Sequence, residues 1–170
     1  TSAKEALRAI FSQRFGADHV LATEGNTNNQ IGVPQNLLRL TSAHRVAVLE
    51  MGTNHPGEIE PLSRCASPDG ALIVSIGSCH LEFLGSLRGV AAEKAEIFRH
   101  LSPGGCAAIP ASCPERDILL AATSSLSPRL SFGLDCGDVR ATWLGGDLAE
   151  SSFRLTYGAE SAEIRWRVPG

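Results

Sequence analysis

The sequence has no excess of basic residues. Its 170 residues carry 15 Lys plus Arg against 18 Asp plus Glu, a formal net charge of -3. Proteins that bind DNA, RNA or anionic membranes draw much of their affinity from a basic field. This charge balance supplies no such field, so we expect neither a nucleic acid nor a membrane as a partner.

Long apolar runs and targeting signals are also absent. No stretch approaches the roughly 18 apolar residues that a membrane-spanning helix needs. The first residues do not form a signal peptide, and we find no repeat, linker or low-complexity tract. With 43% hydrophobic and 19% charged residues, the composition excludes a disordered chain and fits a single globular domain.

The five cysteines lack metal-ligand spacing. The closest two, Cys106 and Cys113, have six residues between them, whereas zinc ligands are commonly paired across two to four. An odd number of cysteines without short spacing favours free thiols over disulfides or zinc. We therefore predict buried thiols in a reducing cytoplasm.

Apolar runs alternate with helical patterns over residues 1–137. Strands that alternate with helices predict an α/β fold, with a mostly parallel sheet flanked by helices on both faces. In such sheets, ligands bind beyond the carboxyl ends of the strands. The predicted strands are 19–22, 45–51, 71–76, 106–109 and 129–132; the predicted helices are 2–15, 34–40, 58–66, 90–101 and 115–124, with a loop over 77–89.

The pattern changes after about residue 138. The stretches 139–143, 152–157 and 163–168 alternate in polarity, and Gly145-Gly146 and Gly158 fall between them. This predicts a small antiparallel three-stranded sheet. We expect one domain over 1–170, with a parallel α/β part at 1–137 and an antiparallel meander at 138–170.

Two polar features fall at or after the first two predicted strands. Asn26, Asn28 and Asn29 offer amide donors and acceptors, but such a cluster also suits a plain turn. Glu50 ends a buried apolar run, where a carboxylate is costly unless it is paired or bound to a metal. Mg²⁺ with phosphate oxygens is a fitting partner, and a salt bridge is the alternative.

Two further features follow the strand predicted at 71–76. His80 lies four residues beyond it, either as a functional side chain or as a hydrogen-bonded structural histidine. Lys94 is a lone basic residue between Glu93 and Glu96 on a predicted helix. On the sequence alone, a solvated surface lysine is the favoured interpretation of Lys94.

Three segments together resemble a known family, the central ATPase domain of Mur ligases. They read TEGNTNNQIGVPQNLLRL, VLEMGTNHPGEIEPL and PDGALIVSIGSCHLEFLGSLRGVAAEKAEIF. The words GNTNNQIGVP and GEIEPL are most similar to members that add D-alanyl-D-alanine to a UDP-N-acetylmuramoyl-tripeptide. The resemblance implies a P-loop-type α/β domain, ATP and Mg²⁺ as cofactors, and an amide-bond ligase of peptidoglycan precursor synthesis that acts through an acyl phosphate.

The resemblance also implies roles for single residues. Thr1 and Ser2 match positions that follow the phosphate-binding lysine of the family. Thr1 and Glu50 are implied to bind one Mg²⁺. His80 and Lys94 are implied to bind a second, because Lys94 matches a lysine that is carbamylated in the family. The residues implied to face the peptide-bearing substrate are Asn26, Asn28, Asn29 and His55.

The matched segments begin after the family's first strand and phosphate loop, and they stop before its adenine-contacting helix. We therefore expect a fragment that is inactive alone, from a protein with further N- and C-terminal domains. Two alternatives stay open. One is a non-catalytic nucleotide-fold binding module related to Mur ligases, and the other is another ligase of the superfamily, such as a folate polyglutamate-type enzyme.

Overall fold

Two sheets form the frame of the molecule in the computed structural model, which describes residues 2–147 and 150–167. One sheet is the parallel pair β1-β2, and the other has six strands in the order β3-β4-β5-β6-β7-β8. The strands are β1 (Val20–Ala22), β2 (Val46–Val48), β3 (Gly70–Leu72), β4 (Cys106–Pro110), β5 (Arg129–Leu134), β6 (Val139–Gly146), β7 (Ser151–Tyr157) and β8 (Glu160–Trp166).

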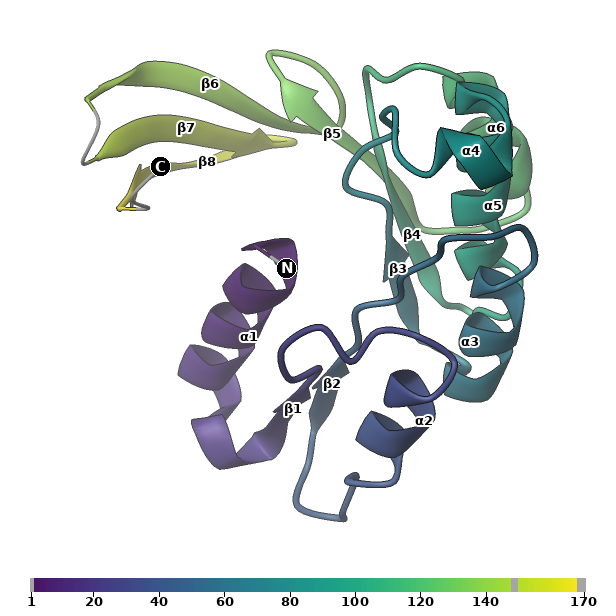
Figure 1. Cartoon of the computed structure of the whole chain (residues 1–170). Coiled ribbons are helices and arrows are strands. Elements are labelled where there is room, and N and C mark those ends of the chain that lie inside the picture. Colours follow the sequence, from purple (N-terminus) through teal and green to yellow (C-terminus); the bar gives the residue numbers. More distant parts are fainter. Residues whose placement is uncertain (1, 148–149, 168–170) are drawn as a thin grey trace.

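Helices lie on both sides of the parallel strands, which confirms the predicted α/β class. Figure 1 shows α1 on one side and α2 to α6 on the other. The helices are α1 (Ser2–Phe15), α2 (Gly32–Leu37), α3 (Ile59–Ala66), α4 (Leu81–Leu84), α5 (Leu87–Ala95) and α6 (Arg116–Ala122), with 3-10 turns η1 (Ala17–His19) and η2 (Glu96–Phe98).

The main core lies between β3-β4 and the helices α5 and α6. Val90, Ile109 and Leu119 are at most 1% exposed there. A smaller cluster joins α2 to α3 through Val33, Ile59 and Leu62. Burial of these side chains stabilises the helices against the sheet by about 1.5–3 kcal/mol per large side chain.

The predicted loop at 77–89 is wrong in part. It contains the short helix α4, and α5 begins at Leu87 rather than at residue 90. The reason is a cap: the Ser86 side chain accepts a hydrogen bond from the Gly89 amide, which fixes the first turn of α5. At its other end, α5 passes into the 3-10 turn η2.

The strands β2 and β3 are shorter than the apolar runs that predicted them. The ladder between β1 and β2 ends at Ala22 opposite Val48, and that between β3 and β4 ends at Leu72 opposite Ala108. The apolar residues beyond these points therefore enter the loops at the carboxyl edge instead of extending the sheet.

The C-terminal strands are antiparallel to one another, as predicted, but they continue the main sheet. β6 pairs in parallel with β5, with Val139 opposite Phe132. Parallel neighbours usually need a long crossover, yet only four residues connect these two. Asp138 holds the connection, since its carboxylate accepts the Ser131 amide and hydroxyl, both at 2.7 Å. These bonds lower the pKa of Asp138.

The predicted turn at Gly145-Gly146 is also wrong. Both glycines lie inside β6, where the register with β7 shifts between Trp143 and Gly145. Gly145 and Gly146 have φ values of 139° and 158°. The Gly pair therefore forms an irregularity within a strand, which a sequence pattern does not distinguish from a turn.

The prediction of buried thiols is wrong as well. All five cysteines are free, but Cys65 and Cys106 are exposed and the other three are part-buried. Cys106 begins β4 opposite Gly70, which has no side chain to cover it. Burial raises the pKa of the Cys113 thiol. Within the described ranges, no helix combines the length and the hydrophobicity that crossing a bilayer requires.

Candidate functional site

The loop after β1 and the end of β2 are joined by a buried threonine. Thr23 is 2% exposed, and its amide donates to the Val48 carbonyl at 3.0 Å. Its hydroxyl accepts the Glu50 amide at 2.9 Å. These bonds prolong the contact between the two chain segments beyond the strands, so the loops that follow start from a fixed point at the carboxyl edge.

Asn28 meets Glu50 at this edge. The Asn28 amide nitrogen donates to Glu50 Oε1 at 3.1 Å and to Asn26 Oδ1 at 3.0 Å. The Asn28 carbonyl accepts the Gly52 amide at 2.8 Å. A Cβ on Gly52 would lie 2.9 Å from Asn28 Cγ, so glycine is needed for this close approach. The structure therefore brings Asn26, Asn28 and Glu50 together.

Asn29 has a local structural role. Its side-chain oxygen accepts the amides of Ile31 and Gly32 at 3.1 and 2.9 Å. These contacts start α2 at Gly32, two residues before the predicted start at Pro34. The side-chain oxygen of Asn29 thus has the role that a plain turn predicts, because it binds amides within the same loop.

His80 follows β3 along the chain, and Lys94 reaches the loop after β3 from α5. Lys94 extends from α5, and its Nζ donates to the Ser75 carbonyl at 3.1 Å. His80 is exposed, has a left-handed φ of 52°, and precedes α4. Its side chain makes no hydrogen bond or ion pair with the rest of residues 2–147 and 150–167. The structure therefore attaches Lys94 to the strand end and leaves the imidazole of His80 open.

His55 lies in the loop after β2, against an aromatic ring from α4. The ring centroids of His55 and Phe83 are 4.2 Å apart. Glu58 shapes this loop: one oxygen accepts the amides of Asn54 and His55 at 2.7 and 3.1 Å, and the other lies 3.3 Å from His55 Nδ1. The backbone bonds lower the pKa of Glu58.

The described residues do not form a complete metal cage. No group of three His, Cys, Asp or Glu side chains among them is placed to hold a metal ion. Mg²⁺, however, is usually bound by one or two carboxylates together with substrate phosphates and water. Glu50 fits that mode as an oxygen ligand at a strand end. Thr1 lies outside the described residues, and Ser2 is exposed as the first residue of α1.

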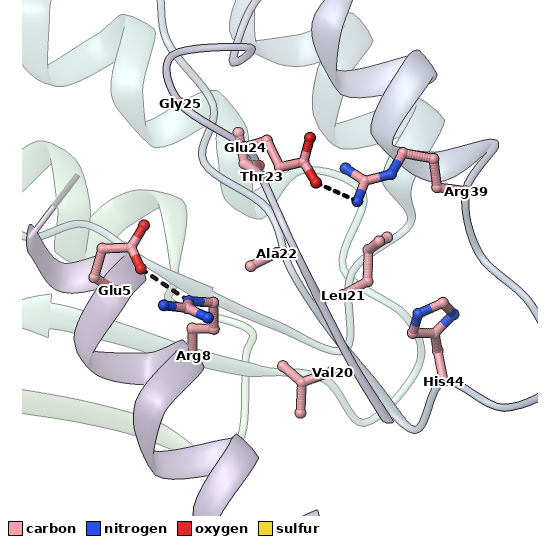
Figure 2. A pocket seen from close by; sticks show the side chains of 10 residues that line it. All are labelled: Glu5, Arg8, Val20, Leu21, Ala22, Thr23, Glu24, Gly25, Arg39 and His44. Carbon is pink, nitrogen blue, oxygen red and sulfur yellow. Dashed lines mark hydrogen bonds and ion pairs between the residues drawn. The ribbon is translucent and has the colours of Figure 1, made fainter. Parts of the chain in front are cut away.

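A cavity of about 320 Å³ lies elsewhere, beside β1 (Figure 2). Figure 2 shows ion pairs on two sides of it, Glu5 with Arg8 from α1, and Glu24 with Arg39. None of Glu50, His80 and Lys94 lines it. The three predicted metal-binding residues therefore lie outside the lining of this cavity.

Comparison with known proteins identifies the family. All residues, 1–170, match the family described as the Mur ligase middle domain. The chain belongs to this family. The UDP-N-acetylmuramoyl-tripeptide–D-alanyl-D-alanine ligase of Haemophilus influenzae is 48% identical over 120 residues, which are 69% of this chain and 26% of that protein.

Solved structures agree with the Mur ligase assignment. MurF from Acinetobacter baumannii superposes with a TM-score of 0.93 at 36% identity, over all of this chain and 36% of that one. MurF from Thermotoga maritima in complex with ADP gives a TM-score of 0.79 at 25% identity, over 97% of this chain and 38% of that one. The chain thus spans about a quarter of the curated relative and just over a third of each solved structure.

Sequence reasoning missed two buried charges in this Mur ligase domain. Lys4 on α1 is 5% exposed, and its Nζ donates to the carbonyls of Thr23 and Gly25 at 2.8 and 3.2 Å. Glu93 on α5 is 6% exposed. A signal existed for Glu93, which lies three residues after Val90 and four before Ile97, the spacing of an apolar face.

Proposed function

We propose that this chain is the central ATP-binding domain of a ligase that adds D-alanyl-D-alanine to UDP-N-acetylmuramoyl-tripeptide in the cytoplasm. The 48% identity to the Haemophilus influenzae ligase of that name carries the proposal. Residues 1–170 form one domain, with its α/β part at 1–137 and its meander at 138–170. The rest of the enzyme supplies the N- and C-terminal domains, which hold the uridine and the amino substrate.

The cofactors in this proposal are ATP and Mg²⁺. The ADP complex of the Thermotoga maritima relative supports a nucleotide at this domain. Thr1 and Ser2 contact the nucleotide, and Thr1 and Glu50 hold Mg²⁺ beside its phosphates. Bound Mg²⁺ offsets the negative charge that gathers on the phosphoryl oxygens. Asn28 supports this role for Glu50, because it orients the carboxylate through the 3.1 Å bond.

Lys94 carries a carbamate in the working enzyme, and with His80 it holds the second Mg²⁺. The neutral amine attacks CO2, an N–C bond forms and a proton leaves, so a cation becomes an anionic oxygen ligand. The half-buried position of Lys94 and its hydrogen bond to the Ser75 carbonyl support this role. A protonated lysine could not bind a metal ion.

The peptide-bearing substrate lies against Asn26, Asn28, Asn29 and His55. Its terminal carboxylate accepts the γ-phosphoryl group of ATP, and the amine of D-alanyl-D-alanine then displaces phosphate to form the amide. The proximity of Asn26 and Asn28 to Glu50 supports this placement, because it puts amide donors next to the carboxylate that serves the nucleotide.

Phosphate release by the full-length protein tests the function. We expect release that requires ATP, the UDP-linked tripeptide and D-alanyl-D-alanine together, and none from the 170 residues alone. Lys94→Ala should lower kcat by about 100-fold or more, and short carboxylates should restore part of it. Glu163→Gln, on the exposed face of β8, is the control. Full activity of Lys94→Ala would contradict the proposed carbamate. No phosphate release by the wild-type protein would contradict the proposed ligase function.

A further inference from the structure

Glu93 is a buried carboxylate on α5 that binds the start of another helix. Its Oε2 accepts the Gly57 amide at 2.7 Å, and its Oε1 accepts the Glu58 and Ile59 amides at 3.0 and 2.9 Å. These amides begin α3, which has no side-chain cap of its own. Glu93 therefore supplies from a distant helix the acceptor that the first turn of α3 needs.

The segment that Glu93 holds is the loop of His55. Glu93 fixes its C-terminal end at Gly57 and beyond, and the Thr53 hydroxyl lies 3.4 Å from Glu93 Oε1. The side chain of Glu58, whose amide Glu93 binds, accepts the His55 amide. The His55 ring then meets Phe83 at 4.2 Å. The contacts thus run from Glu93 through the loop backbone to the placement of one imidazole.

Glu93 also precedes Lys94 in the sequence, and the two side chains bind different loops. Lys94 Nζ binds the Ser75 carbonyl beyond β3, while the Glu93 carboxylate binds the loop before α3. One turn of α5 therefore connects two segments that carry proposed site residues. Because Glu93 is 6% exposed, water cannot replace its bonds without opening this contact.

We propose that Glu93 is a positioning residue that sets the place of His55 for the peptide-bearing substrate. This inference rests on the proposed function, since the substrate is that of the ligase. Glu93 acts through the loop and touches neither the nucleotide nor the substrate. A role confined to the stability of α3 would leave the energetic effects of Glu93 and His55 independent, whereas positioning makes them overlap.

Steady-state kinetics of the full-length enzyme separate the two roles. We expect Glu93→Ala to raise the KM for the UDP-linked tripeptide about tenfold, the effect of losing about 1.4 kcal/mol of binding. The KM for ATP should change less than about twofold. His55→Ala should have a similar effect, and the double variant should be no worse than either single variant. Multiplied effects in the double variant, or an unchanged tripeptide KM, would overturn the proposal.

Two further variants control for folding and charge. Glu93→Gln keeps one oxygen acceptor but places an NH2 group against amide donors, so we expect a KM increase of about threefold. Asp117→Asn also removes a carboxylate that contacts α5, through Arg88 on the solvent side, and should leave both KM values unchanged. An effect of Asp117→Asn equal to that of Glu93→Gln would overturn a specific role for Glu93.

A spectroscopic readout keeps this inference separate from ligase activity. The Phe83 ring lies close enough to His55 to shift its imidazole proton resonances. Glu93→Ala and Phe83→Leu should both move these resonances toward the values of a free histidine, while Asp117→Asn should leave them in place. Unchanged resonances in Glu93→Ala would overturn the positioning role even in an active ligase. If the resonances change in a protein that has no ligase activity, Glu93 does position His55, but the proposed peptide-bearing substrate is wrong.

Discussion

Two loops at the carboxyl edge are held by buried groups of opposite charge. The loop after β1 is held by the Lys4 ammonium, which binds the carbonyls of Thr23 and Gly25. The loop before α3 is held by the Glu93 carboxylate, which binds the amides of Gly57 to Ile59. The sign of each group matches the backbone atoms that it binds: the cation donates to carbonyl oxygens, and the anion accepts from the amides at a helix start.

Among the variants that test this comparison, Lys4→Met should lower the free energy of unfolding most. It keeps the buried chain but leaves two carbonyls without their charged donor, so we expect the free energy of unfolding to fall by about 3 kcal/mol. Urea denaturation measures the change. Arg8→Met is the control, because Arg8 lies one turn later in an exposed pair with Glu5 and should cost less than about 1 kcal/mol. Equal losses in the two variants would show that burial of Lys4 is unimportant.

A neutral group offers an intermediate case. Asn36 is 3% exposed and donates to the carbonyls of Thr27 and Gly32 at 3.1 and 2.8 Å. Asn36→Ala should lower the unfolding free energy by about 1.5 kcal/mol, less than Lys4→Met, because neutral hydrogen bonds are weaker. Gln35→Ala, exposed on the same helix, should stay within about 0.5 kcal/mol. A loss for Asn36→Ala above that of Lys4→Met would reverse the ranking.

Lowering the pH should have a weaker effect than these substitutions, and the effect should fall on the loop before α3. Backbone bonds lower the folded-state pKa of Glu58, so its contribution is present above the ordinary glutamate value of about 4.3 and is lost as the pH falls through the lowered pKa. Hydrogen exchange at Asn54 and His55, corrected for intrinsic rates, should then accelerate. In Glu58→Ala, which has no side-chain acceptor, these amides should exchange fast at every pH. Protection that persists at low pH would contradict this assignment.

The smallest expected effect is the coupling energy between Lys4 and Glu93. Lys4 and Glu93 share no partner in the part of the chain that the structure describes, so their effects should add. The double variant Lys4→Met/Glu93→Gln should differ from the sum of the single variants by less than about 0.5 kcal/mol. A larger coupling energy would mean that the two loops behave as one unit.

Local patterns predicted most of the elements. Alternating apolar runs and helical spacing located the parallel strands and the long helices, because those residues face one continuous core. They missed α4 and the early start of α5, which depend on the Ser86 cap rather than on periodicity. They also missed that β6 joins β5, since the bonds between Asp138 and Ser131 form across a short connection that no hydrophobic period encodes.

The candidate site was predicted more by motif than by physics. The carboxylate at the end of the second strand was visible in the sequence, and the structure adds Asn28 as its neighbour. The sequence predicted no role for Lys4 or Glu93, each of which has a charged residue beside it. Their partners are backbone groups 19 to 36 residues away, and backbone groups carry no sequence signal.

The burial of Lys4 makes the chain unusually simple for amine chemistry. The sequence contains two lysines, Lys4 and Lys94. Lys4 is 5% exposed, and its ammonium binds two carbonyls and Glu5, so an acylating reagent finds neither space nor a free lone pair there. Lys94 is thus the one side-chain amine open to acylation. Acylation mapped to position 94 therefore reports on whether that amine is free.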